Sequence, residues 1–134
     1  MNIEDLKKAY EVLDDTKKYW DLREKFLKEN NISEAFWRAY SDSQCKGLEL
    51  IDFENIVQGE EFSDIVENLK RFKIKEFTMS VNSTDVIERI KIFVDLGCEI
   101  IGIVSIKKPY QSGIEKSFLK KTSDFKPAIK FKVC

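Results

Sequence analysis

The stretch from Ile74 to Ile106, IKEFTMSVNSTDVIERIKIFVDLGCEIIGIVSI, decides the fold. Its first part, KEFTMSV, is short and rich in strand-forming residues, with Phe77 and Met79 on one face. A helical pattern follows, and Gly97 stands where a helix commonly ends in a left-handed residue. The last part, CEIIGIVSI, is a nearly continuous β-branched run, typical of a strand buried on both faces. We therefore expect a strand–helix–strand unit whose two strands form a parallel pair.

The helix of this unit begins after Asn82 and Ser83, either of which can cap its first turn by accepting from free N–H groups. Asp85 adds negative charge where the helix dipole favours it. The apolar residues recur at the spacing of one helix face, and they are Val86, Ile87, Ile90, Phe93 and Val94. We expect this stripe to pack on the sheet.

Four more helical patterns precede the unit, at about residues 3–13, 17–29, 33–46 and 61–72, each with apolar residues at helical spacing. The third pattern carries an aromatic stripe of Phe36, Trp37 and Tyr40. Such a stripe is typical of a core, although aromatic side chains can also form a platform on which bases stack. The core interpretation is the favoured one.

Residues 48–57, LELIDFENIV, indicate either a short strand or an extended linker that lies on the helices. Their acidic residues form a negative cluster with nearby carboxylates, and the set is Asp52, Glu54, Glu60, Glu61 and Asp64. Oxygen ligands of this kind can bind a divalent cation, but their spacing matches no calcium loop. A solvated acidic surface with no metal is therefore expected.

The C-terminal part of the chain begins with a polar, lysine-rich connection from Lys107 to Lys126. Its length is typical of a functional or mobile loop. The closing segment PAIKFKV alternates strictly, with Ile129, Phe131 and Val133 on one side. This pattern predicts a half-buried edge strand whose lysines guard the free edge.

Together these patterns predict one α+β domain over residues 1–134. A helical part over residues 1–46 comes first, and an α-β-α-β-β core over residues 61–134 follows. The three strands should form a small mixed sheet, with the last strand antiparallel to its neighbour. A chain of 134 residues with 43% hydrophobic and 35% charged residues is long enough for one domain with a core and has an ordinary globular balance.

Several function classes are excluded or disfavoured by composition. The sequence contains no histidine, which excludes histidine-based acid–base catalysis and every metal site that needs an imidazole. Three widely spaced cysteines indicate no disulfide or metal framework. No glycine-rich phosphate loop is present, so no nucleotide cofactor is expected. No apolar run reaches membrane-spanning length and the N-terminus is charged, which favours a cytoplasmic protein without membrane contact.

Charge is unevenly distributed along the chain. Residues 1–67 hold nine Lys and Arg against 17 Asp and Glu, a net charge of −8, and residues 68–134 hold 14 against seven, a net charge of +7. The simpler interpretation is that the two halves face each other or are solvated. The alternative is a basic surface offered to an anionic partner.

A candidate anion- or partner-binding site follows from the expected parallel strands, because ligands favour the carboxyl ends of such strands and a helix N-terminus attracts anions. The hydroxyls, amides and lysines expected there or in the lysine-rich loop belong to Ser80, Asn82, Ser83, Thr84, Lys107, Lys108, Tyr110, Lys120 and Lys121. The alternative is structural: Asn82 and Ser83 are good helix caps, and the lysines keep a loop in water.

Several motifs resemble a family of small uncharacterised proteins encoded on plasmids, prophages and conjugative elements of Gram-positive gut bacteria. They are FWRAYSDSQCKGLELIDF at residues 36–53, EFT-S at 76–80, the GC pair at 97–98 and PAIKFKV at 127–133. The resemblance covers about residues 33–134, and its motifs are structural, so it assigns no functional residue. It implies mobile-element cargo. Proteins of this size and origin include inhibitors of host defence nucleases, anti-CRISPR proteins among them, and accessory transfer or regulatory factors.

Three function classes remain open from the sequence. The favoured one is a small non-enzymatic module that binds another protein, which requires no catalytic residue. The second is a nucleic-acid-associated factor that uses the lysine-rich half, although no recognised DNA-binding pattern is present. The third, an enzyme that uses Lys107 or a carboxylate, is the least favoured.

Overall fold

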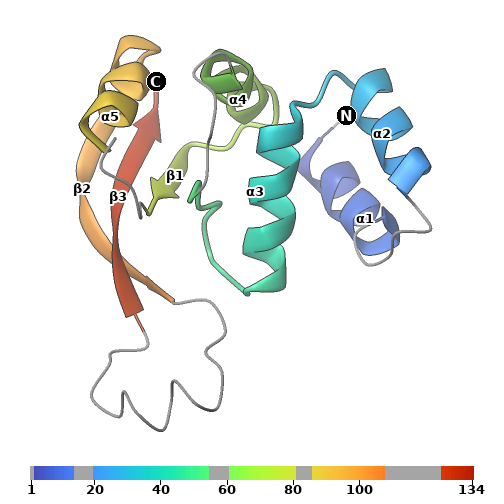
Figure 1. Cartoon of the computed structure of the whole chain (residues 1–134), viewed down its shortest axis with the longest axis horizontal. Coiled ribbons are helices and arrows are strands. Elements are labelled where there is room, and N and C mark those ends of the chain that lie inside the picture. The colour runs from blue at the N-terminus through green and yellow to red at the C-terminus, as the bar shows by residue number, and fades with distance from the viewer. Residues whose placement is uncertain (1, 14–19, 55–60, 81–85, 108–124) are drawn as a thin grey trace, which may run out of the picture.

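The computed structural model of the chain describes residues 2–13, 20–54, 61–80, 86–107 and 125–134. Within these residues it contains five helices and three strands (Figure 1). Their bounds are α1 Ile3–Leu13, α2 Trp20–Glu29, α3 Glu34–Cys45, α4 Glu61–Arg71, β1 Glu76–Met79, α5 Val86–Asp95, β2 Cys98–Lys107 and β3 Phe125–Val133. This order confirms the predicted α+β class, with the N-terminal helices first.

The three strands form one sheet in the order β1-β3-β2, and both neighbours of β3 are antiparallel to it. β1 and β2 therefore run in the same direction, but β3 lies between them. Their predicted pairing, the mixed character of the three-stranded sheet and the edge position of the last strand are wrong. One parallel contact exists outside the named strands, an isolated bridge between Asp52 and Thr78.

The charges of β3 suit its position in the centre. Lys132 stands opposite Glu76 of β1 and opposite Glu99 of β2, and Lys130 makes an ion pair with Glu76 at 3.2 Å. Opposite charges on neighbouring strands stabilise pairing. Of the lysines that suggested a guarded free edge, Lys132 therefore stands opposite an acidic residue on each neighbouring strand, and Lys130 pairs with one on β1.

The core of the sheet is a cluster of phenylalanine rings. Phe77 of β1 lies 5.1 Å from Phe131 of β3 and 5.0 Å from Phe93 of α5, measured between ring centroids. Phe53 joins at 5.4 Å from Phe77, and Phe62 of α4 lies 4.9 Å from Phe93. Aromatic pairs at these separations add favourable ring–ring contacts to the burial of apolar area.

The N-terminal helices pack on the same core through α3 and α4. The predicted aromatic stripe of α3 is buried, which confirms its interpretation as core: Phe36, Trp37 and Tyr40 are all enclosed. Phe36 stacks on Phe72, just after α4, at 5.6 Å. The predicted apolar face of α4 is also buried throughout.

Left-handed residues stand just beyond four helices. Gly47 and Gly97 have φ of 68° and 96°, where glycine avoids the steric cost of a side chain. Asn31 and Lys73 also have positive φ, at 52° and 58°. At Lys73 the following N–H, of Ile74, donates to the Leu69 carbonyl at 2.9 Å, which is the hydrogen bond that defines a Schellman ending.

The predicted stripe of α5 is only partly correct. Phe93 is buried, and Val86 and Ile90 pack against the core. Ile87 and Val94 are exposed. The helix therefore packs through a narrower face than its sequence predicts, because only one side of α5 meets the sheet.

The prediction that β2 is buried on both faces is also wrong. Only Cys98 is buried along β2, because the strand lies at an edge of the sheet that no described segment covers. A register shift between Ile100 and Gly102 marks a bulge, a feature that is common at sheet edges. Figure 1 shows β2 and β3 continuing as a two-stranded ribbon beyond the end of β1.

Candidate functional site

The candidate site predicted from the sequence has nine residues, of which the structure describes Ser80 and Lys107. The others lie outside the described residues: Asn82, Ser83, Thr84, Lys108, Tyr110, Lys120 and Lys121. For these seven, the anion or partner site stays a prediction.

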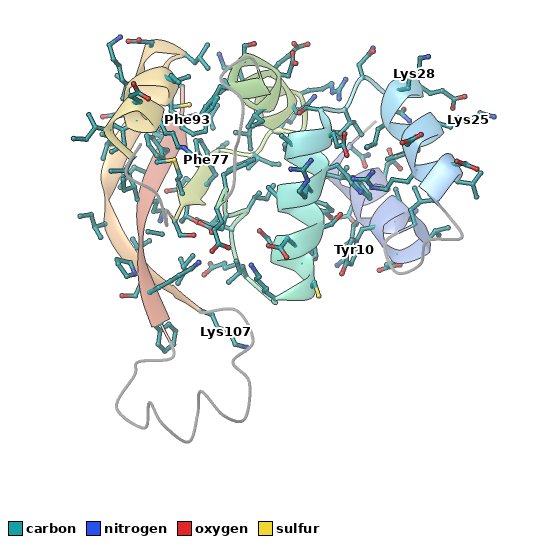
Figure 2. All side chains as sticks on the ribbon, in the orientation of Figure 1. Tyr10, Lys25, Lys28, Phe77, Phe93 and Lys107 are labelled. Carbon is teal, nitrogen blue, oxygen red and sulfur yellow. The ribbon has the colours of Figure 1, made fainter. Side chains whose placement is uncertain are left out.

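Ser80 and Lys107 are not neighbours in the fold. Ser80 directly follows β1, and Met79 at the end of β1 stands level with Ile103 because both pair with Ile129. Lys107 therefore lies four positions further along the ribbon than the level at which β1 ends. Figure 2 shows Lys107 at the far end of the ribbon, away from Phe77 and Phe93. The two strand ends thus do not form one site.

Ser80 belongs instead to a buried polar cluster around Asp52, which is 6% exposed. One carboxylate oxygen of Asp52 accepts from the Thr78 hydroxyl at 2.7 Å and from the Ser80 N–H at 3.0 Å, and the other accepts from the Ser80 hydroxyl at 2.5 Å. The Asp52 N–H donates to the Ser43 hydroxyl at 2.9 Å. The prediction that this acidic residue is solvated is therefore wrong.

The hydrogen bonds of Asp52 hold residues 51–53 against β1, and two backbone hydrogen bonds add to them. The Phe53 N–H donates to the Thr78 carbonyl at 2.9 Å, and the Thr78 N–H donates to the Ile51 carbonyl at 3.0 Å. A buried carboxylate is tolerated only where hydrogen bonds replace water, and here three donors do so. The hydroxyls of Thr78 and Ser80 therefore stabilise the fold through their hydrogen bonds to Asp52.

A second polar cluster links α3 to β3 through Glu54. Lys46 contacts Asp42 at 2.7 Å and Glu54 at 3.5 Å, and Lys126 contacts Glu54 at 3.2 Å. Glu54 is therefore not part of a free acidic surface, contrary to the prediction. The Lys126–Glu54 pair joins the basic half of the sequence to the acidic half, which supports the simpler interpretation of the uneven charge.

The titration of this second cluster follows its contacts. Burial on its own would raise the pKa of Glu54, but hydrogen bonds and charge from Lys126 and Lys46 outweigh it and lower the pKa below its ordinary 4.5. Burial on its own would lower the pKa of Lys46, but Asp42 and Glu54 outweigh it and raise the pKa above 10.5. Both groups are therefore charged at neutral pH.

Lys107 lines a cleft of about 330 Å³ between the β2–β3 ribbon and residues 47–50. Val104 and Ile106 form apolar wall, and Thr78, Ser105 and Lys130 are polar members. Lys130 is paired with Glu76. Within the part of the chain that the structure describes, no ion pair involves Lys107. The cleft is open and mixed in character, and it brings Lys107 together with none of the other described candidate residues.

Five of the exposed large apolar side chains of the described residues are on α5 and β2, and they include the two most exposed ones. We call the set the α5–β2 surface, and its members are Ile87, Val94, Ile100, Ile101 and Ile103. Ile87 is 78% exposed and Ile103 is 77% exposed. The two elements pack against each other, so these side chains come from adjoining parts of the molecule.

The sequence does not reveal the α5–β2 surface, because its apolar patterns predict that every one of these residues lies in the core. A continuous β-branched run carries no alternation that would separate a buried face from an exposed one. One signal could have found it. Gly102 interrupts the run, and a glycine inside a strand often marks a bulge or an edge.

The described residues contain no group of His, Cys, Asp or Glu side chains that could hold a metal ion. Among the helices they form, none is long and apolar enough to span a membrane. Cys98 is buried, and burial raises the pKa of its thiol, with a weaker opposing effect from the charge of Lys70.

Comparison with known proteins gives one family. The profile of the Domain of unknown function (DUF7698) matches residues 35–133. The chain belongs to the DUF7698 family. No curated protein and no solved structure matches it.

The DUF7698 match begins inside α3 and ends at the last residue of β3. It therefore includes the Asp52 cluster, the Glu54 cluster, the cleft beside Lys107 and the whole α5–β2 surface. Helices α1 and α2 precede it. Every feature considered above as a site belongs to the matched part of the chain.

Proposed function

We propose that the chain is a small non-enzymatic module that binds another protein through the α5–β2 surface. The observation that carries the proposal is the concentration of exposed aliphatic side chains there. Of the nine large apolar side chains that are exposed among the described residues, five belong to this surface. An apolar surface of this kind on a folded protein commonly marks a protein interface.

The shape of the molecule supports an interface on this side. α5 and β2 lie at the end of the molecule opposite α1 and α2 (Figure 1). Glu99, Lys107 and Lys91 are exposed on the same two elements, so apolar side chains are interspersed with charges. Protein interfaces likewise contain both apolar and charged side chains.

Two observations support a module without catalytic activity, one from the sequence and one from the Asp52 cluster. The sequence has no histidine. The best candidates for an acid–base or nucleophilic pair, Asp52 and Ser80, are 6% and 2% exposed and bond each other inside the fold. Substrate access to this pair would require the segment 51–53 to leave β1.

The finer part of the proposal concerns the kind of partner. The mobile-element context implied by the sequence resemblance fits an inhibitor of a host defence nuclease, of the anti-CRISPR type. Such an inhibitor acts by surface contact and needs no active site of its own, which agrees with the role proposed for the α5–β2 surface.

A capture experiment tests the proposal. The tagged chain is incubated with a lysate of its host cells, with and without nuclease, and the bound proteins are identified. Ile87→Lys is the test variant, and Val12→Lys on α1 is the matched control, because both side chains are exposed, at 78% and 64%. We expect a partner that survives nuclease, is lost with Ile87→Lys and is retained with Val12→Lys.

Two outcomes would count against the proposal. Capture that is unaffected by Ile87→Lys would place the interface elsewhere. Loss of all captured proteins on nuclease treatment would favour the nucleic-acid alternative, in which binding is indifferent to sequence and falls steeply with salt. The pairing of Lys126 and Lys130 with Glu54 and Glu76 leaves fewer lysines available for that alternative than the sequence suggests.

A further inference from the structure

The direction of the backbone N–H and C=O groups of β2 follows from its pairing with β3. In an antiparallel pair, successive residues turn their N–H and C=O groups alternately to one side and the other. The Val133 N–H donates to the Lys75 carbonyl, beside β1, at 2.8 Å. By alternation, Phe131, Ile129 and Pro127 also face the β1 side, and their neighbours in sequence face β2.

Pro127 confirms this direction, because proline has no N–H to give to a strand ladder. It stands opposite Ser105 of β2. The pair Ser105–Pro127 is therefore one in which the two strands exchange no hydrogen bonds. Ser105 must turn its own N–H and C=O away from β3, towards the free edge of the sheet, and Ile103 and Lys107 do the same.

The free edge is regular only over part of its length. The register shift between Ile100 and Gly102 breaks the alternation at the beginning of β2. From Ile103 to Lys107 the pairing with β3 is continuous. Over these five residues, Ile103, Ser105 and Lys107 thus present a regular row of backbone donors and acceptors with no partner strand among the described residues.

We propose that this row pairs with the same row of a second copy of the chain, antiparallel, with the two-fold axis at Ser105. In this register Ile103 lies opposite the partner's Lys107, and Val104 lies opposite the partner's Ile106. The proposal rests on the backbone of β2 and goes beyond the proposed function, which rests on side chains.

A second copy fits this edge because the row is self-complementary. The three outward-facing residues of one copy meet the three of the other with no residue left over, and each of those pairs exchanges two N–H···O bonds. On one face of the joined sheet, Val104 of each copy contacts Ile106 of the other copy, so the two-fold axis produces this contact twice. On the other face, Ile103 covers the aliphatic stem of the partner's Lys107, whose ammonium group stays in water.

Charge permits the pairing and the bulge selects the register. The chain has a net charge of −1, so two copies repel each other weakly. The two Lys107 side chains lie at opposite ends of the joined strands, so no like charges are directly opposite. A register centred on Ile103 would place the bulge of each copy against regular residues of the other copy. The hydrogen bonds between the two β2 strands would then be interrupted.

The register is tested by cysteine cross-linking in a background in which the exposed Cys45 and Cys134 are replaced by serine. The buried Cys98 is kept. In the proposed register, residues 104 and 106 form a pair without hydrogen bonds, whose Cα atoms are about 4.5 Å apart, within the range of a disulfide. Both side chains line the open cleft, so cysteine is tolerated there.

We expect no cross-linked dimer on oxidation of Val104→Cys alone or of Ile106→Cys alone, because each residue lies diagonally from its own copy, beyond the about 7 Å that a disulfide can bridge. A mixture of the two variants should form the cross-linked dimer. A mixture that stays uncross-linked, or cross-linking of Ile103→Cys on its own, would overturn the proposed pairing.

The hydrogen bonds are tested separately by Ser105→Pro, with Ser105→Ala as the matched control. Proline removes an N–H that points to the free edge and leaves the bonds to β3 intact. Sedimentation should show a concentration-dependent dimer for the native chain and Ser105→Ala, and a monomer for Ser105→Pro. Circular dichroism establishes whether Ser105→Pro folds. If it does not, the cross-linking experiment decides.

The two proposals fail in different ways. A native chain that stays monomeric at all concentrations, yet still loses its captured partner with Ile87→Lys, would overturn the self-pairing alone. A dimer that is lost with Ser105→Pro, in a chain that captures no partner, would support the self-pairing and contradict the protein-binding function.

Discussion

β1 and β2 flank the same central strand, yet one is buried and the other is exposed. Phe77, Thr78 and Met79 of β1 are all enclosed, although β1 has only four residues. β2 has ten residues and a much more aliphatic sequence, but Cys98 is its only buried member. The difference lies in what covers each strand on its outer side. The segment 51–53 bonds the outer edge of β1, and no described segment bonds the outer edge of β2.

The comparison shows that apolar content does not decide burial in a small sheet. A strand is buried when another element adds to its edge and helices cover its faces. β1 has the bridge to Asp52 and the Phe93 ring of α5 against it. β2 has α5 near its beginning only. The following changes are ways to test this contrast, beginning with the largest expected effect.

Phe77→Ala should destabilise the fold by about 3–5 kcal/mol, because it removes a fully buried ring and leaves a cavity among three other rings. Ile103→Ala on β2 should change the free energy of unfolding by less than about 0.5 kcal/mol, as is usual at an exposed position. Denaturant unfolding of both variants at low protein concentration measures the difference. Equal losses would mean that β2 is as essential to the core as β1.

Asp52→Ala should cost about 3 kcal/mol, because the buried donors of Thr78 and Ser80 lose a charged acceptor. Asp52→Asn should cost less, since one oxygen remains to accept. Asp42→Ala, which removes a half-exposed carboxylate of α3, is the control and should cost little. Thermal melting monitored by circular dichroism gives the order of the three. An Asp52→Ala midpoint equal to that of the native chain would show that the bridge to β1 contributes nothing.

Much of the fold could be predicted from the sequence, because apolar residues that recur at helical spacing mark the buried face of a helix. The sequence predicts that the apolar residues of α4 and the aromatic residues of α3 lie in the core, and the structure confirms it. The order of helices and strands followed from the same patterns. Strand neighbours could not be predicted, because a strand–helix–strand unit leaves room for a third strand to insert between the two. The pairing of Lys132 with Glu76 and Glu99 depends on contacts that no local pattern contains.

The candidate site was harder to predict than the fold. Its location followed from the assumption that β1 and β2 are neighbours, and the insertion of β3 separates Ser80 from Lys107. Asp52 was expected on the surface because an isolated acidic residue usually lies there. Its burial depends on hydroxyl donors from Thr78 and Ser80, which are distant in sequence. The exposure of β2 could not be predicted, because a continuous apolar sequence is typical of a buried strand.

Glu54→Gln should lower stability by about 1 kcal/mol at neutral pH, because it breaks contacts with Lys46 and Lys126 in a partly enclosed place. The folded pKa of Glu54 is lowered below 4.5. Its contribution is therefore fully present above that value and is lost as the pH falls through the folded pKa. Urea unfolding at several pH values should show the native chain and the variant converging in acid.

Glu49→Gln is the matched control for this experiment, because it removes an exposed carboxylate from the same segment. It should change stability little at any pH. A Glu54→Gln defect that persists unchanged in strong acid would mean that the variant acts through packing and not through charge.

The smallest expected effect concerns the turn that carries the chain from α4 into β1. Lys73 has φ of 58°, a left-handed conformation that costs an L-residue about 1–2 kcal/mol. Glycine adopts it without that cost but loses about 0.5–1 kcal/mol through the greater freedom of the unfolded chain. Lys73→Gly should therefore stabilise the fold by about 0.5–1 kcal/mol.

Lys75→Gly, two residues further along at an ordinary backbone angle, has the entropic cost without the relief and should destabilise by a similar amount. Comparison of the two denaturation midpoints measures both effects with one method. The opposite order of midpoints would show that the left-handed conformation of Lys73 carries no such cost in the folded chain.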